Sequence, residues 1–139
     1  MCVLSLKWDL SQVEEFVKQL DFSKAGGLVV VIAQDWQTSE ILMQAFANKE
    51  AMIKSLTTGY VHYYSRTRME LWKKGDTSGH LQEIKEVLID CDGDAVLFKI
   101  QQKVAACHEG YRSCFYRKVG DKARLEIIGE KVFNPSDVY

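Results

Sequence analysis

The order of helix-like and strand-like patterns along the chain constrains its fold most strongly. A capping box, Ser11-Gln12-Val13-Glu14, precedes apolar residues at helical spacing and predicts a helix over about Ser11–Leu20. Helices are expected early and strands late, without the alternation of βαβα units. The sequence therefore predicts an α+β fold, with N-terminal helices and a mainly antiparallel sheet, rather than a doubly wound parallel sheet.

Glycine and polar residues divide the chain into the other expected elements. Two consecutive helices are predicted over Ser39–Ala47 and Asn48–Leu56, because Asn48 is a suitable helix N-cap and Gly59 follows the end. Strands are predicted over Leu28–Ala33, Tyr60–Ser65, Met69–Lys74, Glu83–Ile89, Ala95–Gln101, Phe115–Val119 and Arg124–Ile128, with a hairpin turn at Gly120-Asp121. With no repeat and no linker, 139 residues are expected to form one compact domain over positions 1–139.

Composition narrows the class of protein. The net charge of -1 argues against a nucleic-acid partner, since binding phosphates needs an excess of Lys and Arg. No apolar run reaches the length of a secretory signal or a membrane span, so no membrane association is expected and the expected location is the cytoplasm. In that reducing compartment the four cysteines, Cys2, Cys91, Cys107 and Cys114, are expected to be metal ligands, nucleophiles or bystanders rather than disulfides.

An acidic segment, Asp90-Cys91-Asp92-Gly93-Asp94, carries the sharpest local signal. In extended backbone the three carboxylates share one face, while Cys91 points to the other. Hard oxygen ligands suit magnesium or calcium, and a thiolate suits zinc. A calcium loop is excluded by spacing, because the glycine comes too early and Gln101 stands where the bidentate Glu belongs. A solvated acidic turn explains these five residues equally well.

A second segment, 107–114, begins and ends with cysteine. Cys107 and Cys114 are too far apart in sequence for a CxxC zinc knuckle, and two unconnected core cysteines would explain them if they stood alone. Cys91 would complete three thiolates, which is typical of a catalytic zinc site with an open position for water. His108 is then a candidate general base or fourth ligand. His62, in an aromatic strand, is expected to be a packed core histidine.

A third segment combines basic, aromatic and small residues. Its candidates for phosphate binding are Arg66, Arg68, Lys73 and Lys74. Trp72 is suited to stacking on a base, and the small loop Thr77-Ser78-Gly79 lets backbone amides approach an anion. Taken alone, the segment is explained better by a solvated basic strand followed by a turn.

Together these segments resemble the phosphoribosyl-AMP cyclohydrolase family. The resemblance rests on SRTR, LWKKGDTSGH, DCDGD and CHEGYRSCFYR in this order, and it extends over about Leu28–Val119. The family usually carries Glu where this chain has Asp76, which keeps the charge on a shorter side chain.

The resemblance implies a hydrolase of histidine biosynthesis. Its small-molecule substrate would be phosphoribosyl-AMP, whose six-membered purine ring is opened to the formimino-aminoimidazole carboxamide ribotide. The fold would be an α+β, intertwined homodimer. Zinc would be held by Cys107 and Cys114 of one subunit and Cys91 of the other, and magnesium by Asp90, Asp92 and Asp94.

The remaining candidates are assigned roles from their residue types and their places in these segments. His108 and His80 would be the catalytic residues that move protons. The substrate would be bound by Arg66, Arg68, Trp72, Lys74, Thr77, Ser78 and Gly79.

Three other functions compete with this interpretation of the sequence. Zinc deaminases activate water in the same way, but they need H-x-E and P-C-x-x-C motifs, which this sequence does not contain. In a non-catalytic, metal-stabilised binding module, His108 or another side chain would close the zinc tetrahedron. In a purely structural protein, the acidic segment would be a solvated turn.

Overall fold

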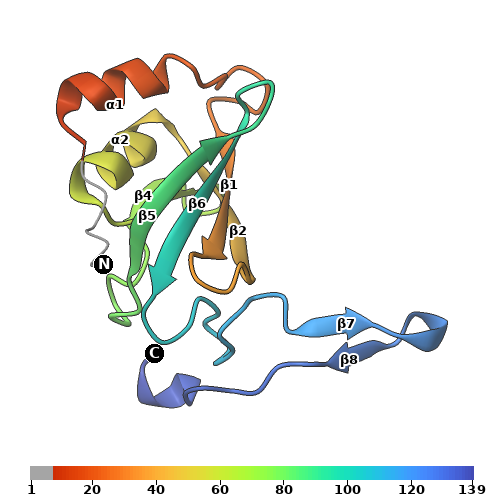
Figure 1. Ribbon diagram of the computed structural model, residues 1–139. Helices are drawn as coiled ribbons and strands as arrows, with labels where there is room; N and C mark the ends of the chain where they lie inside the picture. The colour runs from red at the N-terminus through yellow and green to blue at the C-terminus, as the bar shows by residue number, and fades with distance from the viewer. Residues whose placement is uncertain (1–7) are drawn as a thin grey trace.

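The computed structural model describes residues 8–139, so Cys2 lies outside the described residues (Figure 1). The elements are α1 (Leu10–Val17), β1 (Val29–Asp35), β2 (Ile41–Ala47), α2 (Lys49–Thr58), β3 (His62–Ser65), β4 (Glu70–Lys73), β5 (Gln82–Ile89), β6 (Ala95–Gln102), β7 (Arg117–Val119), η1 (Asp121–Ala123), β8 (Leu125–Ile127) and η2 (Pro135–Asp137). This content confirms the predicted α+β class. Within the described residues no helix is both long enough and apolar enough to cross a bilayer.

The central sheet has the strand order β2-β1-β6-β5. β1 runs antiparallel to β2 and parallel to β6, and β5 runs antiparallel to β6. The sheet is therefore mainly antiparallel, as predicted, with one parallel pairing at its centre. Two smaller ribbons, β3–β4 and β7–β8, complete the strands.

The core lies between one face of this sheet and the two helices. Alternate residues of β1 (Val29, Val31 and Ala33) are fully buried, while the residues between them are half-buried. From α1, Val13 and Val17 join the same core, and α1 packs beside α2 (Figure 1). The period-two burial is that of a strand with one face in the core.

The first helix begins earlier than predicted and ends earlier as well. Asp9, not Ser11, is the N-cap: its side chain accepts from the backbone N–H of Gln12 at 2.9 Å, and the Gln12 side chain accepts from the N–H of Asp9 at 3.0 Å. The capping box therefore lies two residues before the expected one. The helix ends at Val17, short of Leu20.

The prediction of a helix over Ser39–Ala47 is wrong. Ile41–Ala47 forms β2, paired along its length with β1. This segment contains Leu, Met and Ala, which favour helices, but pairing with a buried strand overrides such weak local preferences. The next helix is confirmed: Asn48 caps it through the N–H of Ala51 at 2.8 Å, and Gly59 ends it at φ 82.

The last two strands form an arm that projects from the body of the molecule (Figure 1). We call β7, β8 and their connection the β7–β8 arm. Both strands are shorter than predicted, and the connection is wider than a turn at Gly120-Asp121 because it contains η1. The arm exposes large apolar side chains, namely Val119, Leu125 and Ile127.

Candidate active site

The predicted site residues gather at opposite ends of the central sheet. The β5–β6 turn carries the acidic residues and Cys91 at one end, whereas Cys107 and Cys114 follow the far end of β6 (Figure 1). At a rise of about 3.3 Å per residue, β6 separates the two ends by roughly 25 Å. The structure therefore does not bring Cys91 to the other two cysteines within one chain.

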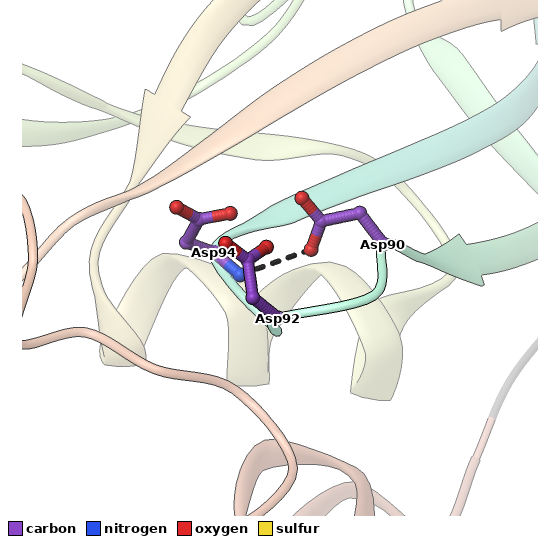
Figure 2. Close-up of side chains that lie close together, drawn as sticks. All are labelled: Asp90, Asp92 and Asp94. Atoms are coloured by element: carbon purple, nitrogen blue, oxygen red, sulfur yellow. Dashed lines mark hydrogen bonds between the residues drawn. The ribbon is translucent and has the colours of Figure 1, made fainter.

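The β5–β6 turn gathers the three carboxylates of Asp90, Asp92 and Asp94, which we call the acidic cluster. One carboxylate oxygen from each lies within 4.8 Å of the others. Figure 2 shows the three side chains gathered at the turn. Asp90 Oδ1 accepts from the backbone N–H of Asp94 at 3.1 Å and of Ala95 at 3.2 Å. The carboxylates gather as expected, although a turn rather than extended backbone brings them together. Three such oxygens fit a hard cation.

A lysine far away in the sequence contacts the acidic cluster. Lys24 Nζ lies 2.9 Å from Asp92 Oδ2 and 3.7 Å from Asp94 Oδ2. The hydrogen bond from Lys24 lowers the pKa of Asp92 to about 2, while hydrogen bonding with Asp92 raises the pKa of Asp94. No local pattern in the sequence predicts Lys24 at this site, because it lies 68 positions before Asp92.

The cysteine loop, Cys107–Cys114, brings its two thiols together. Burial first, and then the charge of Cys107, raises the pKa of Cys114 to about 11. The backbone N–H of Glu109 donates to Cys107 Sγ at 3.4 Å. Two adjacent sulfurs suit zinc and leave its tetrahedron incomplete, so the donor set fits a third thiolate from elsewhere.

The cysteine loop is held against the β1–β2 hairpin. Arg112 Nη2 donates to Asp35 Oδ1 at 2.7 Å, and Asp35 is buried. Ser113 Oγ donates to the carbonyl of Ile41 at 2.7 Å, and Cys114 N–H donates to the carbonyl of Leu42 at 2.7 Å. The segment wrongly predicted as a helix is thus the support of the cysteine loop. Sequence analysis therefore also missed the contacts of Asp35 and Arg112.

A cavity of about 250 Å³, which we call the basic cavity, lies beside the β3–β4 ribbon. Its lining residues are Arg68, Trp72, Lys73, Lys74, Gly75, Asp76, Thr77, Ser78, His108 and Tyr139. Most of the predicted substrate-binding residues thus share one cavity. Arg66 and Gly79 are not among the lining residues, and the Arg66 guanidinium lies over the Phe46 ring at 4.0 Å.

Lys74 connects the basic cavity to the cysteine loop. Its Nζ donates to the carbonyl of Ala106 at 2.6 Å. Burial lowers the pKa of Lys74, and the nearby thiols of Cys107 and Cys114 oppose that shift. The Lys74 ammonium group therefore lies between the basic cavity, which is suited to phosphate, and the cysteine loop, which is suited to metal.

The three histidines have different surroundings. His80 is buried, its Nδ1 has no hydrogen-bond partner among the described residues, and burial followed by the charges of Lys74 and Lys103 lowers its pKa. His108 is exposed at the cavity, with Nε2 3.3 Å from Glu109 Oε1. His62 is buried with Nδ1 2.8 Å from the carbonyl of Tyr60, which confirms the predicted core position.

A buried polar chain lies behind these groups. Tyr63 OH donates to Gln82 Oε1 at 2.6 Å, and Gln82 Nε2 donates to Gln102 Oε1 at 2.8 Å. Gln102 Nε2 then donates to the carbonyls of His80 and Ala105, each at 3.1 Å. This series of hydrogen bonds links the His80 backbone to the segment that leads into the cysteine loop.

Comparison with known proteins gives one consistent result. Residues 43–116 match the family model described as "Phosphoribosyl-AMP cyclohydrolase". The chain is 57% identical over 114 residues to a protein of that name from Methanococcoides burtonii, covering 81% of this chain and 90% of the relative. It is 54% identical over 123 residues to one from Desulfatibacillum aliphaticivorans, covering 87% and 97%.

Proposed function

The chain belongs to the phosphoribosyl-AMP cyclohydrolase family, and from this premise we propose that it opens the purine ring of phosphoribosyl-AMP with the help of zinc. Family membership makes it a hydrolase acting on a cyclic amidine in histidine biosynthesis. The observation that carries this proposal is that the basic cavity and the cysteine loop are neighbours. Lys74 lines the cavity and also contacts Ala106, directly before Cys107.

The basic cavity supplies groups for each part of a phosphorylated purine. Arg68, Lys73 and Lys74 offer positive charge for phosphate, and the Thr77–Ser78 hydroxyls offer further donors. Trp72 packs against Tyr63 with ring centroids 5.1 Å apart, which holds the indole in place as a stacking surface. These contacts would orient the amino-bearing carbon of the purine toward the cysteine loop.

Hydrolysis adds the oxygen of water to the amino-bearing carbon, breaks its bond to the phosphoribosylated nitrogen and leaves a proton on that nitrogen. His108 lines the cavity and is exposed to solvent, so it can exchange this proton. His80 is buried, and its lowered pKa keeps its imidazole neutral near pH 7. We propose these two histidines as the acid–base residues.

Zinc would be bound by Cys107 and Cys114 together with Cys91 of a second copy. Zinc held by three thiolates with an open position supplies a water that is activated near neutral pH. The roughly 25 Å length of β6 supports a ligand from another subunit, because the cysteines of one chain stand at its two ends.

Exposed apolar surface supports the homodimer that this arrangement requires. The outer face of the central sheet carries Val30, Ile32 and Leu97. The register of β1 and β6 places these side chains together, and they are only half-buried. The β7–β8 arm adds further exposed apolar residues. A second copy covering such surface would remove it from water, and a twofold contact would build two identical sites.

The acidic cluster would hold magnesium. Its carboxylates offer the oxygen ligands that this ion prefers, and Lys24 occupies part of the same electrostatic site. The cytoplasmic location and the absence of a nucleic-acid partner remain expectations from the sequence.

The test of this function is a ring-opening assay. Purified protein supplied with zinc and magnesium is mixed with phosphoribosyl-AMP, and the ultraviolet spectrum is followed for conversion of the purine to the opened imidazole. We expect turnover that disappears on zinc chelation and returns when zinc is restored. Zinc-loaded, folded protein that leaves the spectrum unchanged would contradict the proposal.

A further inference from the structure

Residues 131–139, which we call the C-terminal segment, return from the β7–β8 arm to the basic cavity. Val132 N–H donates to the carbonyl of Gly110 at 2.7 Å. Gly110 has φ 101, and a Cβ there would lie 2.7 Å from the carbonyl oxygen of Phe133. Only glycine permits so close a crossing in this backbone conformation. The C-terminal segment is therefore fixed on the cysteine loop.

The end of the C-terminal segment is a hydrogen-bonded turn beside the cavity. Asn134 Oδ1 accepts from the N–H and the hydroxyl of Ser136, at 3.1 Å and 2.9 Å. Tyr139 N–H donates to the carbonyl of Pro135 at 2.9 Å. The turn directs Tyr139 to the basic cavity, where it is one of the lining residues.

Phe133 links this turn to the buried histidine. Its ring meets the His80 ring edge to face, with centroids 4.8 Å apart and planes at 80°, and it lies 6.3 Å from the Tyr139 ring. His80 is 7% exposed, and its Nδ1 has no partner among the described residues. Buried ring nitrogens almost always have a hydrogen-bond partner, so this one points to a missing ligand or proton carrier. Phe133 restricts the ring without occupying that nitrogen.

We propose that the C-terminal segment is a wall of the substrate cavity, in which Phe133 is a positioning residue for His80 and Tyr139 contacts the bound phosphorylated purine. This inference rests on the proposed function. It concerns residues that lie beyond the part of the chain matched by the family model, residues 43–116.

The experiment compares Phe133→Leu with Phe133→Tyr, because tyrosine keeps the aromatic edge and leucine removes it. The His80 ring signals are followed by NMR over a range of pH, together with zinc content, kcat and KM. In Phe133→Leu we expect shifted His80 signals and a kcat about tenfold lower, with zinc content unchanged. Phe133→Tyr should restore both.

Tyr139→Ala should raise KM for phosphoribosyl-AMP and leave kcat near the wild-type value.

A control for the His80 signals and for stability is Phe16→Leu, which removes an edge-to-face contact with Trp8 at 5.4 Å and 82° at a position that does not line the basic cavity. Because Phe16 lies beside Cys91 and the acidic cluster, the kcat of this variant is not part of the control. Phe16→Leu should cost similar stability without moving the His80 signals. His80 signals and kcat that stay unchanged in Phe133→Leu would overturn the inference. A wild-type protein without ring-opening activity would instead contradict the proposed function, while the NMR comparison would still decide the contact between Phe133 and His80.

Discussion

At the scale of single residues, the site depends on charges brought together from distant parts of the chain. Lys24 is the clearest case, because it contacts two carboxylates of the acidic cluster. A divalent cation bound to these carboxylates would be repelled by the ammonium group. Lys24 is therefore expected to weaken metal binding. In the metal-free protein it reduces the repulsion between the carboxylates.

Lys24→Gln should accordingly bind magnesium about threefold more tightly than the wild type. Isothermal titration with magnesium chloride measures the affinity directly. Asp92→Asn is the matched control and should bind magnesium more weakly, because it removes a charged ligand. An affinity lowered by Lys24→Gln would show that the lysine supports the ion rather than competing with it.

The buried His80 predicts a dependence of stability on pH. Its pKa in the folded protein is lowered from 6.5, so below that pH the unfolded chain binds more protons and stability falls as the pH falls. The loss can reach about 1.4 kcal/mol per pH unit for one group. His80→Gln should lose less free energy of unfolding between pH 6.5 and pH 5 than the wild type, as measured by urea denaturation.

His62 also has a pKa lowered by burial, but it is present in both proteins, so the difference between them isolates His80. Parallel pH profiles for the two proteins would mean that the His80 ring is hydrated in solution.

At the scale of elements, the β1–β2 hairpin supports the cysteine loop through the ion pair of Asp35 with Arg112 and through hydrogen bonds to two carbonyls of β2. Asp35→Asn should lower the free energy of unfolding by about 2 kcal/mol, because the carboxylate charge opposite Arg112 is lost and an NH2 donor replaces one of its two accepting oxygens. It should also weaken zinc binding, measured by competition with a chelator, since the loop is no longer held in one place. Arg112 also contacts Glu40 at a longer 3.5 Å, and that carboxylate is half-exposed.

Glu40→Gln is therefore the control, and it should change stability by less than about 0.5 kcal/mol. Equal effects of Asp35→Asn and Glu40→Gln on zinc affinity would contradict the role given to the hairpin.

The sequence predicted those elements whose local pattern agrees with their tertiary surroundings. α2 was predicted from its caps, and β5 and β6 were predicted as two strands joined through the acidic segment. β2 was missed because its residues favour helices and only the pairing with β1 makes them a strand. Among site residues, the acidic cluster and the part of the basic cavity between Arg68 and Ser78 arise from neighbours in sequence, whereas His108 and Tyr139 join that cavity from distant positions. The contacts of Lys24 and Arg112 join positions 68 and 77 residues apart, which no local pattern reveals.

At the scale of the whole molecule, the structure separates Cys91 from the pair Cys107 and Cys114 of the same chain, and it leaves apolar surface on the sheet and on the β7–β8 arm. Both observations support a dimer whose zinc sites combine Cys91 of one copy with Cys107 and Cys114 of the other. The spacing of the cysteines in sequence left open whether they meet within one chain. Their positions at the two ends of β6 favour a shared site.

The most direct test of this account mixes two inactive variants, Cys91→Ala and Cys107→Ala. In a heterodimer, one site keeps all three cysteines, because one copy still offers Cys91 and the other offers Cys107 with Cys114. Refolding the variants together should therefore give heterodimers that each bind one zinc ion and have up to about half of the ring-opening rate of a wild-type dimer. Heterodimers confirmed by mass that bind no zinc and leave phosphoribosyl-AMP unopened would contradict the shared site.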